Sequence, residues 1–187
     1  MNVVELSIPG AYLLKSPVWG DERGFFREWF KAGDLSTEGL DFEVRQANFS
    51  SSVRDVVRGL HYSLAPEGQS KLVTCVAGEV DDVIVDIRVG SPTFARHEVV
   101  RLAANAPYAV LLPGGAAHGF VVRSETAGLA YLLSSPYNAP LELEIDPFDA
   151  ELGIAWDLGA PAILSDKDRD APSLEQRRRA GELPAFA

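Results

Sequence analysis

The sequence predicts an all-β fold, an antiparallel sandwich or barrel, that ends in an irregular tail with one short helix. Short apolar runs recur through the first three-quarters of the chain, and segments rich in Gly, Pro, Asn and Asp such as "SPVWGDERG", "VGSP" and "PGGAA" separate them. No long helical pattern lies between these runs. About ten strands at this spacing indicate antiparallel pairing.

The candidate strands follow one another in the order of the apolar runs. They are expected at residues 3–8, 12–14, 24–30, 42–48, 56–62, 71–76, 79–87, 95–101, 108–112, 119–122 and 128–133. The pair "KLVTCVAGEVDDVIVDIR" predicts a hairpin that turns at Ala77 and Gly78.

The last forty or so residues have a different character. "DPFDAELGIAW" and "SDKDRDAP" are irregular, whereas "SLEQRRRAGEL" predicts a short helix with Ser173 as its N-cap. The chain has no linker, repeat or low-complexity tract. We therefore expect one domain over residues 1–187, with a barrel at about 1–145 and a tail at about 146–187 packed on it.

Composition and charge restrict the possible functions. With 47% hydrophobic and 24% charged residues, the 187-residue chain is typical of a soluble globular protein. A net charge of −10 argues against binding to nucleic acid, because phosphate neutralisation needs a basic surface. The single cysteine, Cys75, cannot form an internal disulfide and is expected to be a small buried hydrophobe. No signal peptide or membrane-spanning run is visible, so a cytoplasmic protein without a membrane partner is expected.

The histidines do not predict a metal site. Only His61, His97 and His118 are available, and no two of them are separated by a single residue, the spacing that places two ligands on one face of a strand. Nucleotide-cofactor and nucleophile motifs are also missing from the sequence. We therefore predict neither a metal nor an organic cofactor.

The strand "VVRGLHY" carries two polar residues, Arg58 and His61, within an apolar run. In a regular strand these residues, three apart, would point to opposite faces. A glycine inside a strand often marks a bulge, and a bulge at Gly59 would bring both side chains to one side. His61 alone fits a hydrogen-bonded core histidine equally well.

Several other polar residues have both a structural and a functional interpretation. Lys71 is either an exposed lysine at a strand edge or a cation inside the barrel. Of Asp81, Asp82 and Asp86, at least one must be paired or must line a polar cavity, because aspartate is unfavourable in strands. His118 directly precedes a predicted strand, where side chains often reach a barrel mouth.

Together these groups suit one type of chemistry, proton transfer next to a carbonyl on an anionic substrate. A histidine can take a proton near neutral pH. A tyrosine, Tyr131 or Tyr137, can return a proton from the other side, although either also fits a core position. A lysine or arginine can stabilise the enolate oxygen that forms in between.

The chain resembles the dTDP-4-dehydrorhamnose 3,5-epimerase family of cupin-fold nucleotide-sugar epimerases from about residue 4 to about residue 176. The resemblance is carried, in order, by "GDERGFFREWF", "QANFS", "VVRGLHY", "GQSKLVTCVAGEVDDVIVDIRVGSPTF", "PGGAAHGF", "YLLSSPY" and "ELGIAW" with "PAILSDKDRDAP". Several such motifs in the correct order are far more specific than any one of them.

The resemblance implies a double-stranded antiparallel β-barrel (cupin or jelly roll) that works as a homodimer, needs no cofactor and acts on a TDP-4-keto-6-deoxy sugar. By position, His61 resembles the base that removes the proton alpha to the keto group, and Asp168 the carboxylate that orients this base. Tyr131 resembles the acid and Lys71 the cation that stabilises the enolate. Substrate contacts are expected from Arg23, Glu28, Gln46, Asn48, Arg58, His118, Tyr137, Glu142 and Lys167.

One segment departs from the pattern of the rhamnose-pathway enzymes. Leu132 follows Tyr131 where those enzymes have a lysine, and Pro136 precedes Tyr137 where they have paired tyrosines. This segment and the tail "YNAPLELEIDPFDAELG" look more like epimerases of antibiotic deoxysugar pathways, some of which invert one carbon only. Epimerisation at C3 is expected, with C5 left open. The alternatives are a C3-only mono-epimerase, a ketoisomerase on the same substrates, and a sugar-binding cupin without activity.

Overall fold

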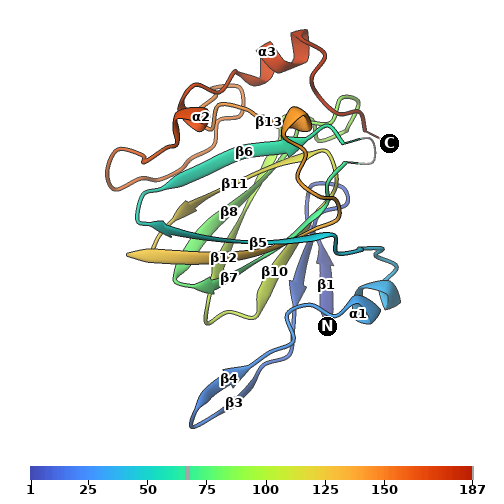
Figure 1. Ribbon diagram of the computed structural model, residues 1–187, viewed down its shortest axis with the longest axis vertical. Helices are drawn as coiled ribbons and strands as arrows, with labels where there is room; N and C mark the ends of the chain where they lie inside the picture. The colour runs from blue at the N-terminus through green and yellow to red at the C-terminus, as the bar shows by residue number, and fades with distance from the viewer. Residues whose placement is uncertain (66–67, 187) are drawn as a thin grey trace.

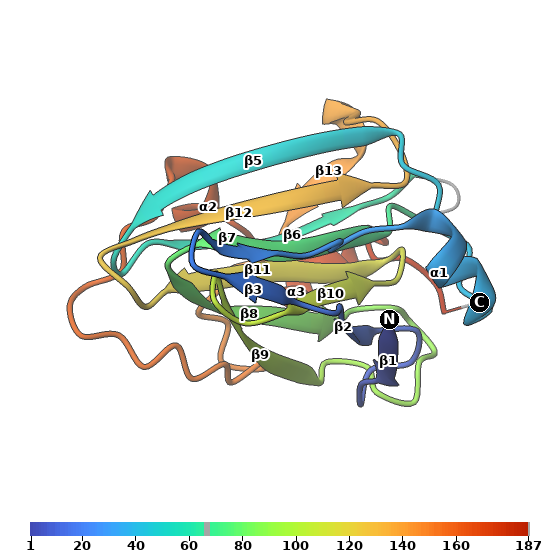
Figure 2. The ribbon, with the colours of Figure 1, turned by 90° about the horizontal axis from the view of Figure 1, so that it is seen from below.

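Two antiparallel sheets face each other and form the body of the structure (Figure 1 and Figure 2). The computed structural model describes residues 1–65 and 68–186. One sheet has six strands in the spatial order β1 (Asn2–Glu5), β2 (Tyr12–Lys15), β10 (Tyr108–Leu112), β7 (Lys71–Ala77), β12 (Thr126–Leu133) and β5 (Gln46–Val53). The other has five, in the order β13 (Glu142–Glu144), β6 (Val57–Ser63), β11 (Ala116–Val122), β8 (Glu79–Asp86) and β9 (His97–Ala103).

This arrangement confirms the predicted all-β jelly roll. The strand pairings keep the two sheets separate, so the fold is a two-sheet jelly roll and not a closed cylinder. The predicted hairpin at Ala77 and Gly78 was wrong, because β7 and β8 do not pair with each other: β7 lies between β10 and β12 in one sheet, and β8 lies between β11 and β9 in the other. Only the predicted turn is present, at Gly78, whose φ of +68° favours glycine. Apolar side chains from both sheets fill one end of the space between them and include the fully buried Cys75, as predicted.

The C-terminal tail packs on the outer face of the five-stranded sheet (Figure 1). Trp156 and Leu174 of the tail join Val85 and Val121 of the sheet in one buried apolar cluster. The tail contains the short helices α2 (Asp166–Arg169) and α3 (Leu174–Arg179), and a 3-10 turn, η1 (Ala139–Leu141), precedes β13. Ser173 caps α3 in a capping box, so the predicted helix and its N-cap are confirmed.

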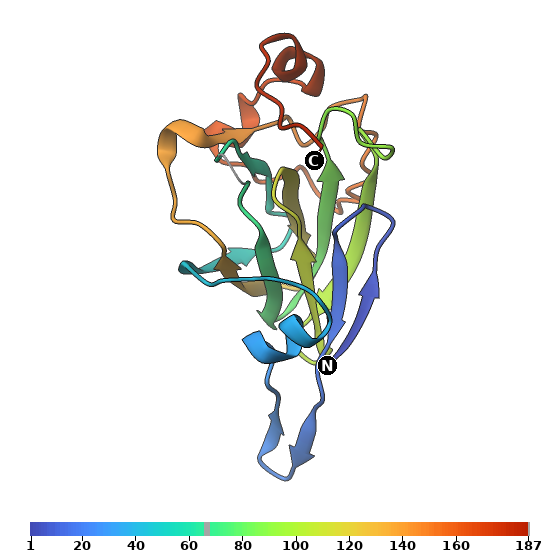
Figure 3. The ribbon, with the colours of Figure 1, turned by 90° about the vertical axis from the view of Figure 1, so that its right-hand side faces the viewer.

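Two N-terminal elements lie outside the sheets. The hairpin of β3 (Trp19–Asp21) and β4 (Gly24–Phe26) extends away from the barrel (Figure 1 and Figure 3). The helix α1 (Ala32–Thr37) packs Leu35 onto the outer face of the six-stranded sheet. None of the described helices is long and apolar enough to cross a membrane.

The predicted strand at residues 42–48 was placed too early, because β5 begins at Gln46. The structure explains the error, since Ser50 and Ser52 of β5 face polar groups between the sheets and not an apolar core. The strand at 24–30 was also too long, and β11 begins at Ala116 rather than at residue 119. His118 therefore lies inside a buried strand and not in a loop at its start.

Candidate active site

A β-bulge in β6 turns two polar side chains into the space between the sheets. His61 and Arg58, three residues apart on β6, pair with His118 and Phe120, which are only two residues apart on β11. The extra residue on β6 is the mark of a bulge. Because of it, Arg58 and His61 both line one cavity, as the sequence predicted from Gly59.

The bulge requires glycine at position 59. Gly59 has a φ of +122°, a conformation that residues with a side chain rarely adopt. A Cβ atom there would lie 2.6 Å from the Cα of Gly119 and 2.7 Å from the carbonyl oxygen of His118. Both contacts are with the backbone of β11, so no side-chain rotation can relieve them.

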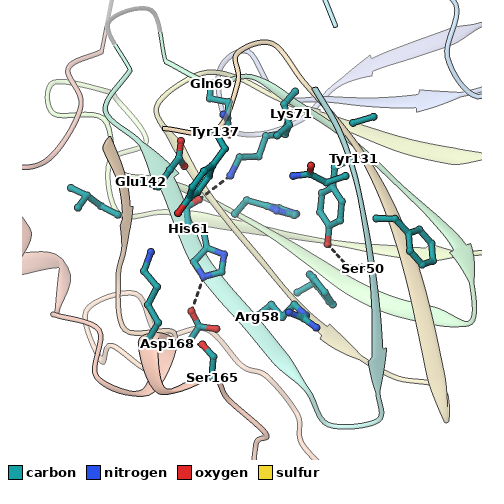
Figure 4. Close-up of a pocket in the computed structure, with 18 residues that line it drawn as sticks. Ser50, Arg58, His61, Gln69, Lys71, Tyr131, Tyr137, Glu142, Ser165 and Asp168 are labelled. Carbon is teal, nitrogen blue, oxygen red and sulfur yellow. Dashed lines mark hydrogen bonds and ion pairs between the residues drawn. The ribbon is translucent and has the colours of Figure 1, made fainter. Parts of the chain in front are cut away.

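The cavity lies at one end of the jelly roll, between the two sheets, and has a volume of about 650 Å³ (Figure 4). That size suits a small organic ligand. Ten of the residues expected at a site line it, namely Asn48, Arg58, His61, Lys71, His118, Tyr131, Tyr137, Glu142, Lys167 and Asp168. The sequence analysis did not single out Ser50, Gln69 and Ser165, which line it too.

His61 is hydrogen-bonded to a buried carboxylate. Its Nε2 lies 2.6 Å from Oδ1 of Asp168, a residue of α2 that is 107 positions further along the chain (Figure 4). The side chain of Asp168 is 4% exposed, whereas that of His61 is 41% exposed at the cavity. Burial favours a higher pKa for Asp168, but the hydrogen bonds from His61 and Ser165 outweigh it and hold the pKa below its ordinary value. The ionised carboxylate orients the ring and leaves Nδ1 available to accept a proton.

Tyr131 presents a phenol to the same cavity from the other sheet. Its hydroxyl lies 2.9 Å from Oγ of Ser50 on the neighbouring strand β5. Burial raises the pKa of Tyr131 above its ordinary value, an effect that the hydrogen bond to Ser50 only partly offsets. The phenol is therefore protonated at neutral pH and can act as a proton donor.

Lys71 is a buried cation of the cavity and not an edge lysine. It lies on β7, between β10 and β12, and only 8% of it is exposed. Its Nζ donates a hydrogen bond of 3.3 Å to the carbonyl oxygen of His61 on the opposite sheet (Figure 4). Burial lowers the pKa of Lys71 to about 8, although the nearby carboxylates of Glu142 and Asp82 oppose this effect.

All three aspartates of β8 are paired, each with different partners. Asp82 points into the interior, where its Oδ1 lies 2.7 Å from Nε2 of His118. Asp81 points outward and binds two arginines, Arg101 and Arg123. Asp86, at the end of β8, accepts hydrogen bonds from residues of the loop that follows, among them one of 2.8 Å from Nε of Arg88. Burial alone would raise the pKa of Asp86, but these bonds lower it to about 2.

Three of the expected substrate contacts lie outside the cavity lining. Gln46 supports the mouth of the cavity indirectly. Its side-chain amide donates a hydrogen bond of 2.8 Å to Asn48 and accepts one of 2.8 Å from the backbone N–H of Tyr137. Arg23 is exposed at the tip of the β3–β4 hairpin, where it pairs with Asp21, and Glu28 follows that hairpin. Within this chain the structure does not bring Arg23 and Glu28 to the cavity.

The cavity of this jelly roll holds a histidine–carboxylate pair, a buried lysine and a protonated tyrosine on facing walls. This fold and these groups define an enzyme of the cupin type that is suited to acid–base chemistry. Within residues 1–65 and 68–186, no group of three or more His, Cys, Asp or Glu side chains is placed to hold a metal ion. The family model described as dTDP-4-dehydrorhamnose 3,5-epimerase matches residues 5–176. The chain belongs to this family and is an epimerase of a dTDP-linked deoxysugar.

Its relatives match over nearly their whole length. A dTDP-4-dehydrorhamnose 3,5-epimerase of Mycolicibacterium smegmatis is 43% identical, and the match covers 100% of this chain and 92% of the relative. The structure of NovW, a 4-keto-6-deoxy sugar epimerase from the novobiocin gene cluster of Streptomyces spheroides, superposes with a TM-score of 0.95 at 42% identity, covering 100% and 94% of the two chains. ChmJ, a 3'-monoepimerase from Streptomyces bikiniensis in complex with dTDP-quinovose, superposes with a TM-score of 0.92 at 41% identity, covering 96% and 91%.

Proposed function

We propose that this enzyme inverts C3 of a dTDP-4-keto-6-deoxyhexose in the biosynthesis of a specialised deoxysugar. Overall sequence identity does not distinguish 3,5-epimerisation from 3-epimerisation, the two activities found among its relatives. A 3,5-epimerase of Mycolicibacterium smegmatis is 43% identical and a 3-epimerase of Streptomyces bikiniensis is 41% identical. The segment with Leu132 and Pro136, which resembles antibiotic-pathway enzymes, favours inversion at C3.

The observation that carries the proposal is the placement of His61 and Tyr131 on opposite walls of one cavity (Figure 4). His61 removes the proton alpha to the keto group, and the ionised Asp168 stabilises the imidazolium that results. The electron pair moves onto the C4 oxygen and forms an enolate. Tyr131 then donates a proton to the opposite face of C3, so the carbon is inverted and the double bond returns to oxygen.

Lys71 and the remaining polar residues hold the substrate. Protonated Lys71 lies between the two walls and stabilises the negative charge of the enolate oxygen. Arg58, which is fixed by a hydrogen bond of 3.0 Å from its Nε to Ser52, binds the diphosphate. The expected contacts from Asn48, His118, Tyr137, Glu142 and Lys167 fit the sugar and nucleotide, since these side chains line the same cavity.

We further propose that the enzyme is a homodimer and that Arg23 and Glu28 contact the substrate bound to a second copy. The β3–β4 hairpin that carries Arg23 exposes Trp19, Phe25 and Phe26 to solvent, which is unusual for a projecting arm. Insertion into a second copy would bury these rings. Light scattering should give the mass of two chains, and Phe25→Asp with Phe26→Asp should give monomers. A monomeric wild-type enzyme would overturn this part of the proposal.

A proton-exchange experiment tests the reaction itself. The wild-type enzyme and dTDP-4-keto-6-deoxyglucose are incubated in deuterated water and followed by NMR. Deuterium and inversion at C3 alone are expected. Deuterium and inversion at C3 and C5 would identify a 3,5-epimerase, and a product with its carbonyl at C3 would identify a ketoisomerase. Binding without any deuterium uptake would indicate a sugar-binding cupin. We also propose a cytoplasmic location for the enzyme, which the dTDP-linked substrate supports.

A further inference from the structure

The cavity contains a second histidine–carboxylate pair beside the first. His118 is the direct cross-strand partner of His61. Nε2 of His118 is hydrogen-bonded to Asp82, just as Nε2 of His61 is hydrogen-bonded to Asp168. We propose that Asp82 is a positioning residue, which holds His118 as the tautomer protonated at Nε2 so that Nδ1 accepts a hydrogen bond from a hydroxyl group of the sugar. The part that concerns the sugar rests on the proposed function.

The surroundings of Asp82 indicate that its carboxylate serves His118 and not the stability of the fold. Asp82 is fully buried, and its cross-strand neighbours are Val100 and Phe120. Its Oδ2 has no hydrogen-bond partner among the residues that the structure describes. A buried carboxylate with one unpaired oxygen is unfavourable for folding, because the charge loses its hydration. Such a group is expected where its remaining contact, here His118, has a functional use.

The chemistry of the pair fixes the position of one proton. An ionised carboxylate only accepts hydrogen bonds, so Nε2 of His118 must carry the hydrogen at the 2.7 Å contact. In the neutral ring Nδ1 then has a free lone pair. The ring lines the cavity and packs edge-on against Tyr131, with 6.2 Å between the ring centroids, so both packing and the carboxylate limit its rotation.

An acceptor at this point complements the other groups of the cavity. Arg58 and Lys71 can only donate hydrogen bonds, and they suit the diphosphate and the keto oxygen. A hexose also has hydroxyl groups, whose hydrogens need acceptors in the cavity. Nδ1 of His118 supplies one such acceptor next to the proposed acid, Tyr131.

The charge of Asp82 also acts on the lysine. Lys71 faces Asp82 on β8, Glu142 on β13 and the carbonyl oxygen of His61 on β6. The two carboxylates raise the pKa of Lys71 against the effect of burial. Removal of the Asp82 charge should therefore lower the pKa of Lys71 and shift the alkaline limb of the activity profile to lower pH, which a purely structural role would not do.

NMR of the histidine rings tests the tautomer without any substrate. The chain has only three histidines, so ¹⁵N labelling of histidine gives three ring systems, which His61→Asn and His118→Asn assign. In the wild type, Nε2 of His118 should be protonated and Nδ1 unprotonated. Asp82→Asn should populate the other tautomer of His118, while Asp168→Asn should change only the signals of His61. A wild-type His118 protonated at Nδ1 would overturn the proposal.

Kinetics with a matched control completes the test. Asp82→Asn should lower kcat/KM on the order of 10-fold to 100-fold, the range seen when the outer hydrogen-bond partner of a metal-ligating histidine is removed. Asp81→Asn removes a carboxylate one position away on the outer face and should leave both kcat/KM and the His118 signals unchanged. If Asp82→Asn folds and keeps the tautomer, the pH profile and kcat/KM of the wild type, Asp82 has no positioning role. Wild-type protein without epimerase activity would overturn the proposed function alone, because the ring measurement needs no turnover.

Discussion

His61 and Tyr131 face the same cavity from different sheets, His61 from β6 and Tyr131 from β12 (Figure 4). A base and an acid on one wall would return a proton to the face from which it was taken. Placed on two walls, the proposed base and acid would act on opposite faces of the substrate carbon. The separation between the sheets is set by the packed apolar end of the jelly roll, so the two groups are held at a fixed distance.

His61→Asn should abolish exchange of the proton alpha to the keto group, because the asparagine side chain cannot accept a proton at neutral pH. We expect a loss of about 10³-fold or more in the rate of deuterium uptake, measured by NMR in deuterated water. Binding of dTDP should change little. Full exchange by a folded His61→Asn protein would remove His61 from its proposed role.

Tyr131→Phe should separate exchange from inversion. The base and Lys71 remain, so deuterium still enters at C3, but no acid is left to protonate the other face. The inverted product, measured by NMR or chromatography, should fall on the order of 10²-fold or more. Ser50→Ala is the control, since it removes only the partner of the phenol and should retain inversion. An unimpaired rate of inversion in Tyr131→Phe would contradict the assignment.

Lys71 should set an alkaline limit to activity. Its proposed role needs the protonated amine, which is lost as the pH rises through about 8. The rate of epimerisation should therefore fall above pH 8 in the wild type. In Lys71→Arg the guanidinium stays charged, so the residual activity should not fall above pH 8. The same limb in both proteins would show that another group titrates.

Lys71 should also lower the stability of the fold. The pKa of Lys71 falls from the ordinary lysine value of 10.5 to about 8 on folding. At a pH below both values, this shift lowers the free energy of unfolding by about 3 kcal/mol. Lys71→Met should therefore be inactive but more stable than the wild type near pH 7. Because the unfolded chain binds more protons between pH 8 and 10.5, the wild type should approach the variant in stability over that range. Urea denaturation at several pH values measures this difference.

Gly59→Ala should destabilise the fold by about 3 kcal/mol, because the new Cβ meets the backbone of β11 at a positive φ. Gly33→Ala is a matched control. Gly33 lies in α1 with open space around its Cα, so alanine there should be neutral or stabilising by up to about 1 kcal/mol. Thermal unfolding compares the two variants. Equal melting temperatures would show that the bulge tolerates a side chain.

The sequence was sufficient where one local rule decided the structure. Alternating apolar runs and turn residues predicted the all-β fold, and a glycine within an apolar strand predicted the bulge that turns Arg58 and His61 to one side. The same rules failed for β5, because strand patterns assume an apolar inner face and Ser50 and Ser52 face a polar cavity.

Pairings between distant residues could not be read from the sequence. The register of β8 and β11 places Asp82 diagonally across from His118, and a sequence does not display register. No local pattern connects Asp168 with His61 either, and only the resemblance to the family suggested that pair. The short helix that carries Asp168 is too brief to produce a periodic signal.

The hydrogen bond between His61 and Asp168 also has a consequence for biosynthesis. Strand β6 emerges from the ribosome early, whereas Asp168 follows it by 107 residues. Because synthesis proceeds from the N-terminus, both sheets can assemble on the nascent chain while His61 still lacks its carboxylate. The proposed base is thus oriented only after both sheets have been synthesised, and a product released prematurely before Asp168 would have the cavity without this carboxylate.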